Sequence, residues 1–277
     1  MTDFSQTASA YQGRAVVQQA AGEALLDLLA VASHEDVLDL ACGPGALTAR
    51  LRELTRGRMA GCDAAPGMID EARRRHGAAG IEFSVCDAAA LPFAGDFDAI
   101  FCNSAFQWFR DPAAVLGGCR NALRPGGRMA MQAPAKAEFC PNFIRAVETL
   151  RDHAETRDVY ARYQSPWLFL ESAANYAQLF ADAGFRVAAS RMEAVANRCT
   201  PEKALEIFLS GAAMAYLSPA CYAGGFAPEY PSLATDLIAD SLRRQCGADG
   251  LIELIFQRVF VLAYRNSDSS LTGGLPL

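Results

Sequence analysis

The feature that most constrains the fold is an apolar segment that runs directly into a glycine-rich turn. Residues 37–41 have the composition of a buried β-strand, and the turn at residues 42–45 precedes a helical segment that begins at Ala46. Glycine is needed where backbone must approach a ligand closely, and the start of a helix offers free N–H donors. The pattern predicts a nucleotide-like ligand at the end of a central strand.

Strand-like and helix-like segments alternate through the first half of the chain. Further buried strands are predicted at residues 58–62, 81–85, 97–102 and 128–132. A helix is predicted over residues 46–54, and two more begin at Pro66 and Pro112, since proline is favoured in the first helical turn. This alternation is typical of an α/β fold with a doubly wound, mostly parallel sheet.

The regular alternation of strand-like and helix-like segments ends after Pro134. Helical periodicity is expected at residues 142–157, 171–183, 201–217 and 232–244, and strands at residues 185–192 and 254–264. Residues 13–31 also have helical spacing and are expected to lie across the ligand. The expected organisation is a lid helix (residues 1–31), a cofactor-binding core (32–134), the C-terminal half of the sheet with helical cap insertions (135–265) and a flexible tail (266–277).

Aspartates stand at or near the ends of three successive predicted strands. Asp39 lies four positions before the first glycine of the turn, Asp63 follows the second strand and Asp87 follows the third. Beside the turn, the carboxylate of Asp39 repels a pyrophosphate but accepts hydrogen bonds from an ammonium group, directly or through water. Asp63 is placed to accept both hydroxyls of a ribose, and Asp87 to accept the amine of adenine. Each could instead cap a helix, but together they favour a cationic adenosyl ligand.

Five motifs in this order resemble the class I methyltransferases that use S-adenosylmethionine. They are DLACGPG, GCDAAPGMIDEAR, CDAAALPF, FDAIFCNSAFQW and LRPGG, and they cover roughly residues 32–132. The resemblance implies a Rossmann-like, seven-stranded sheet, with S-adenosylmethionine as cofactor and S-adenosylhomocysteine as product. It also implies cofactor contacts from Asp39, Ala41, Gly43 and Gly45 around the methionine part, from Asp63 and Ala64 at the ribose, and from Met68, Cys86, Asp87 and Ala88 around the adenine.

Polar and aromatic residues follow the fourth predicted strand, whose end borders the ligand cleft in a fold of this kind. Asn103 and Ser104 are expected to line the methionine portion, while Gln107 and Trp108 face the reacting centre or the acceptor. The alternative for Trp108 is an ordinary place among core aromatic residues under a loop.

Two weaker patterns add residues to the predicted site. Near the start of the lid helix, Arg14 is placed to pair with the cofactor carboxylate and Tyr11 to close the pocket. Tyr163 and Trp167 would suit an acceptor pocket and are predicted to contact the substrate. A surface position for Arg14, and ordinary cap packing for the two aromatic residues, are the alternatives.

A narrower resemblance suggests the acceptor. Residues 4–29 and 103–108 are similar to both the trans-aconitate methyltransferases and the carrier-protein malonyl methyltransferases of biotin synthesis. Both families methylate a carboxylate, so the resemblance implies O-methylation of a small or carrier-bound carboxylic acid. A carboxylate is already nucleophilic at neutral pH, and no general base is then required.

Composition argues against several other partners. The net charge of -6 disfavours nucleic acid, because no basic surplus replaces counterions on phosphate. The cysteines and the three histidines follow no metal-ligand spacing, and no apolar run is long enough to span a bilayer. We therefore expect no metal and no membrane contact, and a cytoplasmic location.

Three alternative functions remain open. The same fold and cofactor could serve methylation of carbon, nitrogen or a phenolic oxygen in a lipid-like or secondary metabolite. A non-catalytic module that only binds the adenosyl cofactor would use the same residues. An NAD-linked oxidoreductase is disfavoured for two reasons. Thr48 occupies the position of the third glycine of a dinucleotide motif, and the carboxylate of Asp39 would repel a pyrophosphate.

Overall fold

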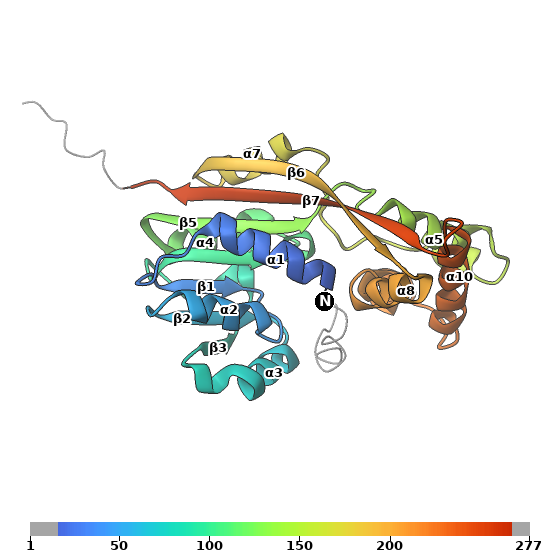
Figure 1. The fold of residues 1–277 in the computed structure, drawn as a ribbon, viewed down its shortest axis with the longest axis horizontal. Helices are drawn as coiled ribbons and strands as arrows, with labels where there is room; N and C mark the ends of the chain where they lie inside the picture. Colours follow the sequence, from blue (N-terminus) through green and yellow to red (C-terminus); the bar gives the residue numbers. More distant parts are fainter. Residues whose placement is uncertain (1–15, 268–277) are drawn as a thin grey trace, which may run out of the picture.

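A seven-stranded sheet in the order β3-β2-β1-β4-β5-β7-β6 forms the centre of the computed structural model (Figure 1), which describes the backbone of residues 16–267 and side chains from residue 21. Strand β7 is antiparallel to both of its neighbours, and the other strand pairs are parallel. The predicted α/β fold is confirmed. The strands are β1 (Val37–Leu40), β2 (Met59–Asp63), β3 (Glu82–Val85), β4 (Phe97–Asn103), β5 (Leu123–Pro134), β6 (Phe185–Cys199) and β7 (Ile252–Arg265).

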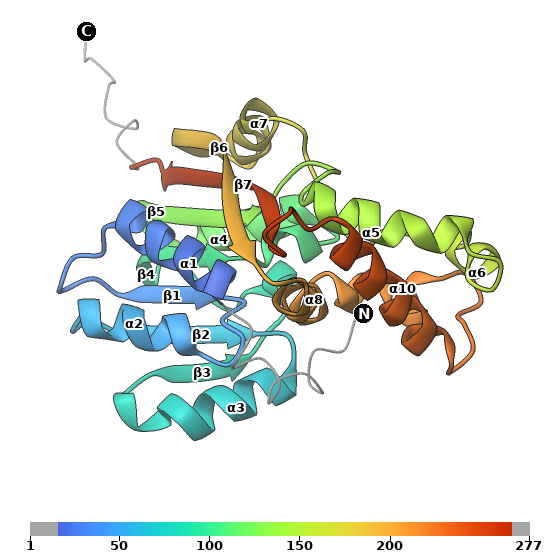
Figure 2. The same cartoon turned by 45° about the vertical axis from the view of Figure 1, so that its right-hand side comes forward.

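Helices cover both faces of the sheet (Figures 1 and 2). Buried apolar side chains of α1, α2 and α3 pack on one face, and those of α4 and α7 pack on the other. The α-helices are α1 (Val16–Leu29), α2 (Ala46–Leu54), α3 (Pro66–His76), α4 (Pro112–Ala122), α5 (Pro141–Asp152), α6 (Arg157–Tyr160), α7 (Ala173–Asp182), α8 (Pro201–Ser210), α9 (Ala213–Tyr216) and α10 (Tyr230–Arg244).

Strand β5 begins earlier than the sequence pattern predicts. Leu123 pairs with Phe97, and Arg128 pairs with Ala99, so residues 124–127 form a bulge opposite a single residue of β4. The bulge interrupts the apolar pattern, and only the regular part of the strand after it matches the predicted residues 128–132.

Strand β6 extends seven residues beyond the segment predicted for it, whereas β7 begins two residues earlier and ends one residue later than predicted. Their ladder continues to the pair Cys199 and Ile252, and it carries the strands out of the core toward the cap helices (Figures 1 and 2). The prediction that β6 ends at residue 192 is wrong. The outer part of β6 alternates between exposed and half-buried side chains, so it lacks the apolar run that marks a core strand.

The cap has its own apolar core, built from α5, α8, α9, α10 and the outer end of β7. The predicted single helix over residues 201–217 is interrupted at Gly211, which adopts a non-helical conformation after α8. The predicted helix over residues 142–157 ends at Asp152, because His153 is extended. The short helix α6 follows after that interruption.

Helix α1 packs on the sheet over the part whose side chains are described. Leu25, Leu26 and Leu29 are buried against Phe101 of β4 and Phe260 of β7. None of the described α1 side chains lines the cavity presented below. Residues 21–29 therefore belong to the core and not to a lid, and the side chains of residues 1–20 lie outside the described part. The predicted tail falls mostly outside it as well, since the description ends at residue 267.

Candidate cofactor and acceptor cavity

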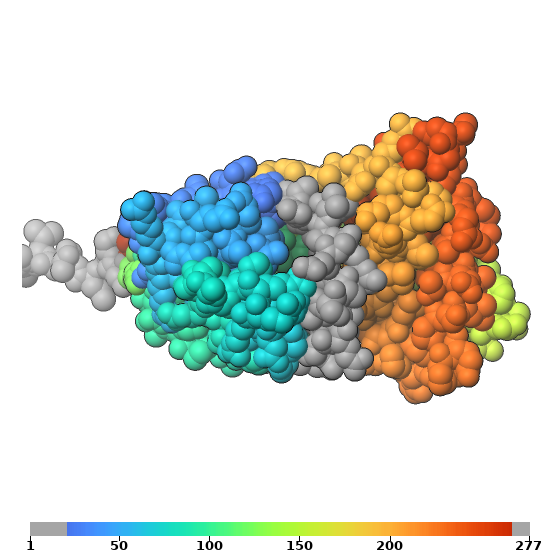
Figure 3. Space-filling model, turned by 60° about the horizontal axis from the view of Figure 1, so that its bottom comes forward, coloured from blue at the N-terminus to red at the C-terminus, as the bar shows by residue number. Residues whose placement is uncertain are grey.

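A cavity of about 620 Å³ lies where the carboxyl ends of the parallel strands face the cap. Figure 3 shows the core, in blue to cyan, on one side of the molecule and the cap, in orange, on the other. Ligands of open α/β sheets bind at this edge, because side chains and turns from several strands converge there. The predicted site residues that line the cavity are Ala41, Gly43, Asp63, Ala64, Met68, Cys86, Asp87, Ala88, Asn103, Ser104, Gln107, Trp108 and Trp167.

The two glycines of the turn after β1 serve different purposes. Gly43 has a φ of +54°, lines the cavity and has no atom within 4 Å of the position that a β-carbon would take. Gly45 has a φ of +83°, but its β-carbon would meet Phe83, Ala72 and His76 at 3.0 to 3.2 Å. Gly43 thus leaves space for a ligand. Gly45 does not line the cavity and instead allows α3 and β3 to pack against the turn.

Asp63 is fixed by backbone groups at the end of β2. Its Oδ2 accepts a hydrogen bond from the N–H of Gly43 at 3.0 Å, and its Oδ1 accepts one from the N–H of Ala65 at 2.9 Å. Burial raises the pKa of this carboxyl, while the two backbone hydrogen bonds oppose that shift. Each carboxylate oxygen has a second lone pair, so Asp63 can also accept two hydroxyl groups from a ligand in the cavity.

Asp87 combines a capping role with a place at the cavity. It is exposed, and its Oδ1 accepts a hydrogen bond from the N–H of Ala89 at 3.0 Å, which caps the short 3₁₀ helix Ala88–Ala90. Asp87 also lines the cavity next to Cys86, and Met68 of α3 lines it nearby with only 3 % of its surface exposed. An aromatic base would find an apolar side chain and a carboxylate together here.

Asp39 does not line the cavity, although the sequence places it near the turn. The carboxyl is buried and accepts a hydrogen bond from Oγ1 of Thr48 on α2 at 2.6 Å. Burial raises the pKa of Asp39 to about 7. The side chain turns under the first turn of α2, so the structure does not place it in the cavity wall, where we expected it to meet an ammonium group directly or through water.

The end of β4 supplies a hydrogen-bonded polar group to the cavity. Ser104 has an unusual φ of +55°, and its Oγ donates a hydrogen bond to Oε1 of Gln132 at 3.0 Å. Nε2 of Gln107 donates to the carbonyl of Ser104 at 3.0 Å. Asn103 and Trp108 also line the cavity. Phe106 does not line it and is fully buried in the core.

The remaining predicted residues fall in different places. Trp167 lines the cavity and meets Trp108 edge to face, with 5.5 Å between the ring centroids. Tyr163 does not line it and stacks instead on Tyr160 and Tyr216 inside the cap, so its predicted substrate contact is not supported. Tyr11 and Arg14 lie outside the described residues.

The cap half of the cavity contains residues that the sequence patterns did not single out. Its wall is formed largely by aromatic and aliphatic side chains, among them Phe139, Phe143, Phe169, Ile207 and Phe256. Arg258 of β7 lies in the same wall with 5 % of its surface exposed. The period-two alternation of Phe256 and Arg258 within the predicted strand was the available signal. It places the two side chains on one face of the sheet but does not show which face meets a ligand.

Two findings concern metals and membranes. No group of three metal-ligating side chains gathers within the described part of the chain. Over the same residues, none of the helices combines the length and the apolarity that crossing a bilayer requires.

Comparison with known proteins shows what the core is similar to. A family described as a methyltransferase domain matches residues 37–127. Malonyl-[acyl-carrier protein] O-methyltransferase of Hahella chejuensis is 37 % identical over 128 residues, 46 % of each chain. Trans-aconitate 2-methyltransferase of Methylobacterium nodulans is 38 % identical over 116 residues, 40 % of this chain and 44 % of that protein. The ubiquinone/menaquinone biosynthesis C-methyltransferase UbiE of Desulfotalea psychrophila is 34 % identical over 159 residues, 54 % and 65 % respectively. The chain thus spans about half the length of the first two relatives.

Solved structures extend the similarity to the whole fold. The YcgJ protein from Bacillus subtilis superposes with a TM-score of 0.61 at 15 % identity, over 90 % of this chain and 99 % of that one. A geranyl diphosphate C-methyltransferase from Streptomyces coelicolor, solved with Mg²⁺, geranyl diphosphate and S-adenosyl-L-homocysteine, gives a TM-score of 0.53 at 18 % identity, over 90 % and 79 %. Residues 37–127 are thus similar to a methyltransferase domain, and the whole sheet shares its fold with solved methyltransferase structures.

Proposed function

We propose that this chain transfers the methyl group of S-adenosylmethionine to a carboxylic acid, either a small molecule or an acyl group held on a carrier. The observation that carries the proposal is one continuous cavity with two chemically different halves. Carboxylates at the ends of β2 and β3 line the core half, and aromatic side chains line the cap half. A donor and an acceptor can therefore meet within one site.

The residues of the core half fit an adenosyl cofactor. Asp63, held by two backbone N–H groups, can accept both ribose hydroxyls, and the apolar face of Met68 suits one side of the adenine. The open space beside Gly43 suits the methionine part, since any larger residue there would extend a side chain into it. The relatives that cover part of this chain are methyltransferases, which supports the same assignment.

When bound, the cofactor supplies an electrophilic methyl group on a positively charged sulfur. The protein's own contribution is to hold the acceptor in line with that group and to keep water away. Trp108 lies between the polar residues of β4 and the aromatic cap wall, where it limits how an acceptor can approach. An ionised carboxylate needs no deprotonation, so the site requires no general base for this acceptor.

Two of the similar proteins methylate acids, which favours a carboxylate over other nucleophiles. Transfer to carbon is the second candidate. It is favoured by the aromatic wall around Phe139, Phe143 and Phe256, which suits an apolar ring or chain, and by the similarity to UbiE over 54 % of this chain.

The two candidates differ in the chemistry of their products. The protein is incubated with methyl-labelled S-adenosylmethionine and a panel that contains trans-aconitate, malonyl-[acyl-carrier protein], straight-chain fatty acids and quinols. A methyl ester releases labelled methanol in mild alkali, whereas a methyl group on carbon, nitrogen or a phenol remains bound. Alkali-labile label on an acid supports the proposal, and alkali-stable label alone overturns it in favour of the second candidate.

A variant tests the cofactor half separately. Asp63→Ala removes the acceptor for the ribose hydroxyls, and we expect S-adenosylhomocysteine to bind about 1 to 3 kcal/mol more weakly in calorimetry. Asp70→Ala on α3 is the matched control, because that carboxylate is exposed and paired only loosely with Arg73 at 3.9 Å. Equal affinities in the two variants would remove Asp63 from the site.

A further inference from the structure

The cap half of the cavity contains a buried cation, Arg258, whose position suggests a function in ligand binding. Arg258 lies within β7, where its Cα is the register partner of Pro134 on β5 and of Glu193 on β6. Both Pro134 and Arg258 line the cavity, and Arg258 has 5 % of its surface exposed. Glu193 is half-buried and forms an ion pair with Arg191 at 2.5 Å. The guanidinium thus belongs to the inner wall of the site and not to the protein surface.

An aromatic cluster forms part of the surroundings of Arg258. Its guanidinium carbon lies 5.6 Å from the ring centre of Phe256, which in turn packs edge to face on Phe143. Burial lowers the pKa of Arg258 to about 10, so the group still carries its charge at neutral pH. In such surroundings solvent screens a charge only weakly, and a nearby anion interacts with it strongly.

The other charged residues of the cavity lie elsewhere in it. Asp63 and Asp87 belong to the core half, and Arg110 and Asp111 are exposed residues that follow the short helix Phe106–Trp108. Among the described residues that the cap contributes to the wall, none is ionised at neutral pH apart from Arg258 on the adjoining strand. The cavity is therefore negative where the cofactor is proposed to bind and positive in the half left for the acceptor.

We propose that Arg258 binds the carboxylate of the acceptor and that this contact makes the site select acids over neutral molecules of the same shape. A guanidinium offers five N–H donors in a planar fork that matches the two oxygens of a carboxylate. The aromatic wall then holds the apolar body of the acceptor. The inference rests on the proposed function and names the residue that decides its substrate class.

The test measures binding, so that it does not depend on methyl transfer. Hexanoate and its neutral analogue hexanamide are titrated calorimetrically into the protein, both alone and saturated with S-adenosylhomocysteine. We expect the wild-type protein to prefer hexanoate. Arg258→Met should weaken hexanoate binding about 10- to 100-fold, the scale of hydrogen bonds to a charged group, and should change hexanamide binding less than twofold. Arg258→Lys keeps the charge without the fork and should lie between the two.

Arg243→Met provides the matched control. Arg243 is an exposed residue of α10 that pairs with Asp240, so the variant removes the same charge from the cap without touching the cavity. We expect its preference for hexanoate to match the wild type. A circular dichroism melt of each variant shows whether it is folded, and Arg258→Lys carries the test if Arg258→Met does not fold.

The possible results separate the two proposals. An unchanged preference for hexanoate in folded Arg258→Met or Arg258→Lys, or no preference in the wild type, overturns the assignment of Arg258. Loss of the preference in those variants supports it, whether or not any acid is methylated. If the protein binds acids through Arg258 but forms no alkali-labile product from any acid, the carboxylate site stands and the proposed transfer fails.

Discussion

Asp39 illustrates how burial alone changes the chemistry of one residue. Its carboxyl is enclosed beneath α2, where burial raises its pKa from 3.8 to about 7; the hydrogen bond from Thr48 opposes this rise in pKa, and the charge of Asp63 adds to it. An unfolded aspartate loses its proton near pH 3.8, while the folded one keeps it to about pH 7. Between these values the folded state holds more protons, so this residue lowers stability as the pH rises.

We therefore predict that Asp39→Asn removes part of the pH dependence of folding. The amide cannot ionise and can still accept the hydrogen bond from Thr48. Relative to the wild type, the variant should gain stability between pH 5 and pH 8, by at most about 4 kcal/mol. Urea unfolding at several pH values measures the difference, and parallel curves for the two proteins would contradict the assignment.

The two glycines of the turn after β1 should respond differently to the same substitution. Gly45→Ala places a β-carbon 3.0 Å from Phe83 in a left-handed conformation and should lower the free energy of unfolding by about 2 kcal/mol. Gly43→Ala meets no atom within 4 Å, so its stability loss should be limited to about 1 kcal/mol of backbone strain. Gly43→Ala should instead bind S-adenosylhomocysteine more weakly. Urea unfolding and calorimetry on both variants test this contrast, which an equal loss of affinity would contradict.

At the scale of residues, the sequence predicts the core half of the cavity well and the cap half poorly. Asp63 and Asp87 could be located because they follow strand ends that an apolar pattern reveals, and consecutive parallel strands bring such ends together. The functions of Gly45 and Asp39 could not be separated from those of their neighbours, because the direction of a side chain within a turn depends on packing. Arg258 acquires its position only through contacts between distant segments.

One arginine connects three elements at the edge of the core. Nε of Arg128 on β5 donates a hydrogen bond to the carbonyl of Leu29 at the end of α1, and its Nη1 pairs with Glu35 before β1 at 2.6 Å. Both charged side chains have only 13 % of their surface exposed. Removing one partner of a buried ion pair costs more stability than removing one partner of a surface pair, because the other charge is left buried and uncompensated.

Arg128→Met should accordingly lower the free energy of unfolding by about 3 kcal/mol, since it leaves Glu35 and the end of α1 without their partner. Arg74→Met on α3 is the control, because Arg74 is exposed and paired with Glu71 only across one helical turn. That variant should change stability by less than about 0.5 kcal/mol. Denaturant unfolding compares the two, and equal effects would show that the buried pair has no special importance.

At the scale of elements, the predicted segments are most accurate where the apolar pattern is regular. Helix α2 begins and ends as predicted, and β1 to β4 differ from their predicted bounds by one residue. The bulge at the start of β5 and the outer end of β6 were missed. These segments are stabilised by pairing with a partner strand and by the cap, neither of which leaves a strong periodic pattern in the local sequence.

The molecule as a whole places both of its tryptophans at the cavity. Trp108 and Trp167 line it and touch each other, and the chain contains only 2 tryptophans. Their fluorescence should therefore report on cavity contents. We predict that hexanoate and S-adenosylhomocysteine each change the emission, and that Trp167→Phe reduces the hexanoate response more than the cofactor response. Fluorescence titrations of wild type and variant measure this, and an emission unchanged while calorimetry shows binding would contradict it.

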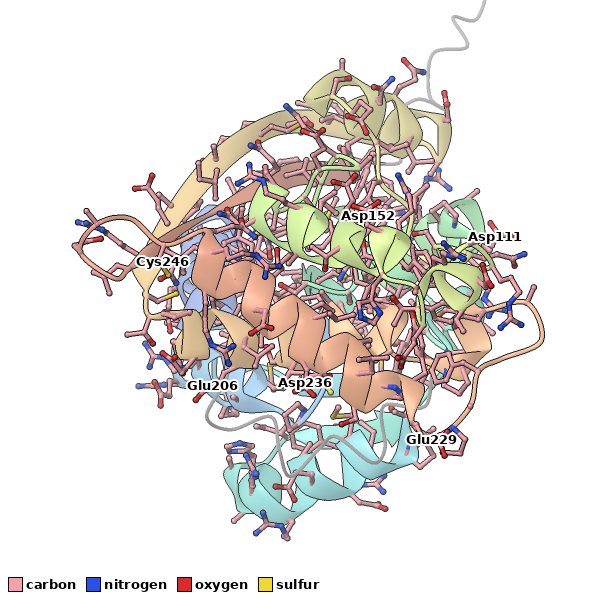
Figure 4. All side chains as sticks on the ribbon, turned by 90° about the vertical axis from the view of Figure 1, so that its right-hand side faces the viewer. Asp111, Asp152, Glu206, Glu229, Asp236 and Cys246 are labelled. Atoms are coloured by element: carbon pink, nitrogen blue, oxygen red, sulfur yellow. The ribbon has the colours of Figure 1, made fainter. Side chains whose placement is uncertain are left out.

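The outer face of the cap is rich in carboxylates (Figure 4). Asp152, Glu206, Glu229 and Asp236 are exposed on or beside α5, α8 and α10, and the chain has a net charge of -6. Arg151 and Arg243 are exposed on the same helices, so this face carries charges of both signs.

The paired strands β6 and β7 run from the core into the cap, with one shift of register between Val187 and Ala189 near the core end. Two strands that are hydrogen-bonded along their length resist bending more than a single connecting segment does. The core and the cap therefore have little freedom to move apart as rigid bodies. Substrate entry must then depend on smaller segments at the rim. Substitutions at the cap end of β6 and β7 can then change which acceptors fit, while the core half of the cavity keeps its shape.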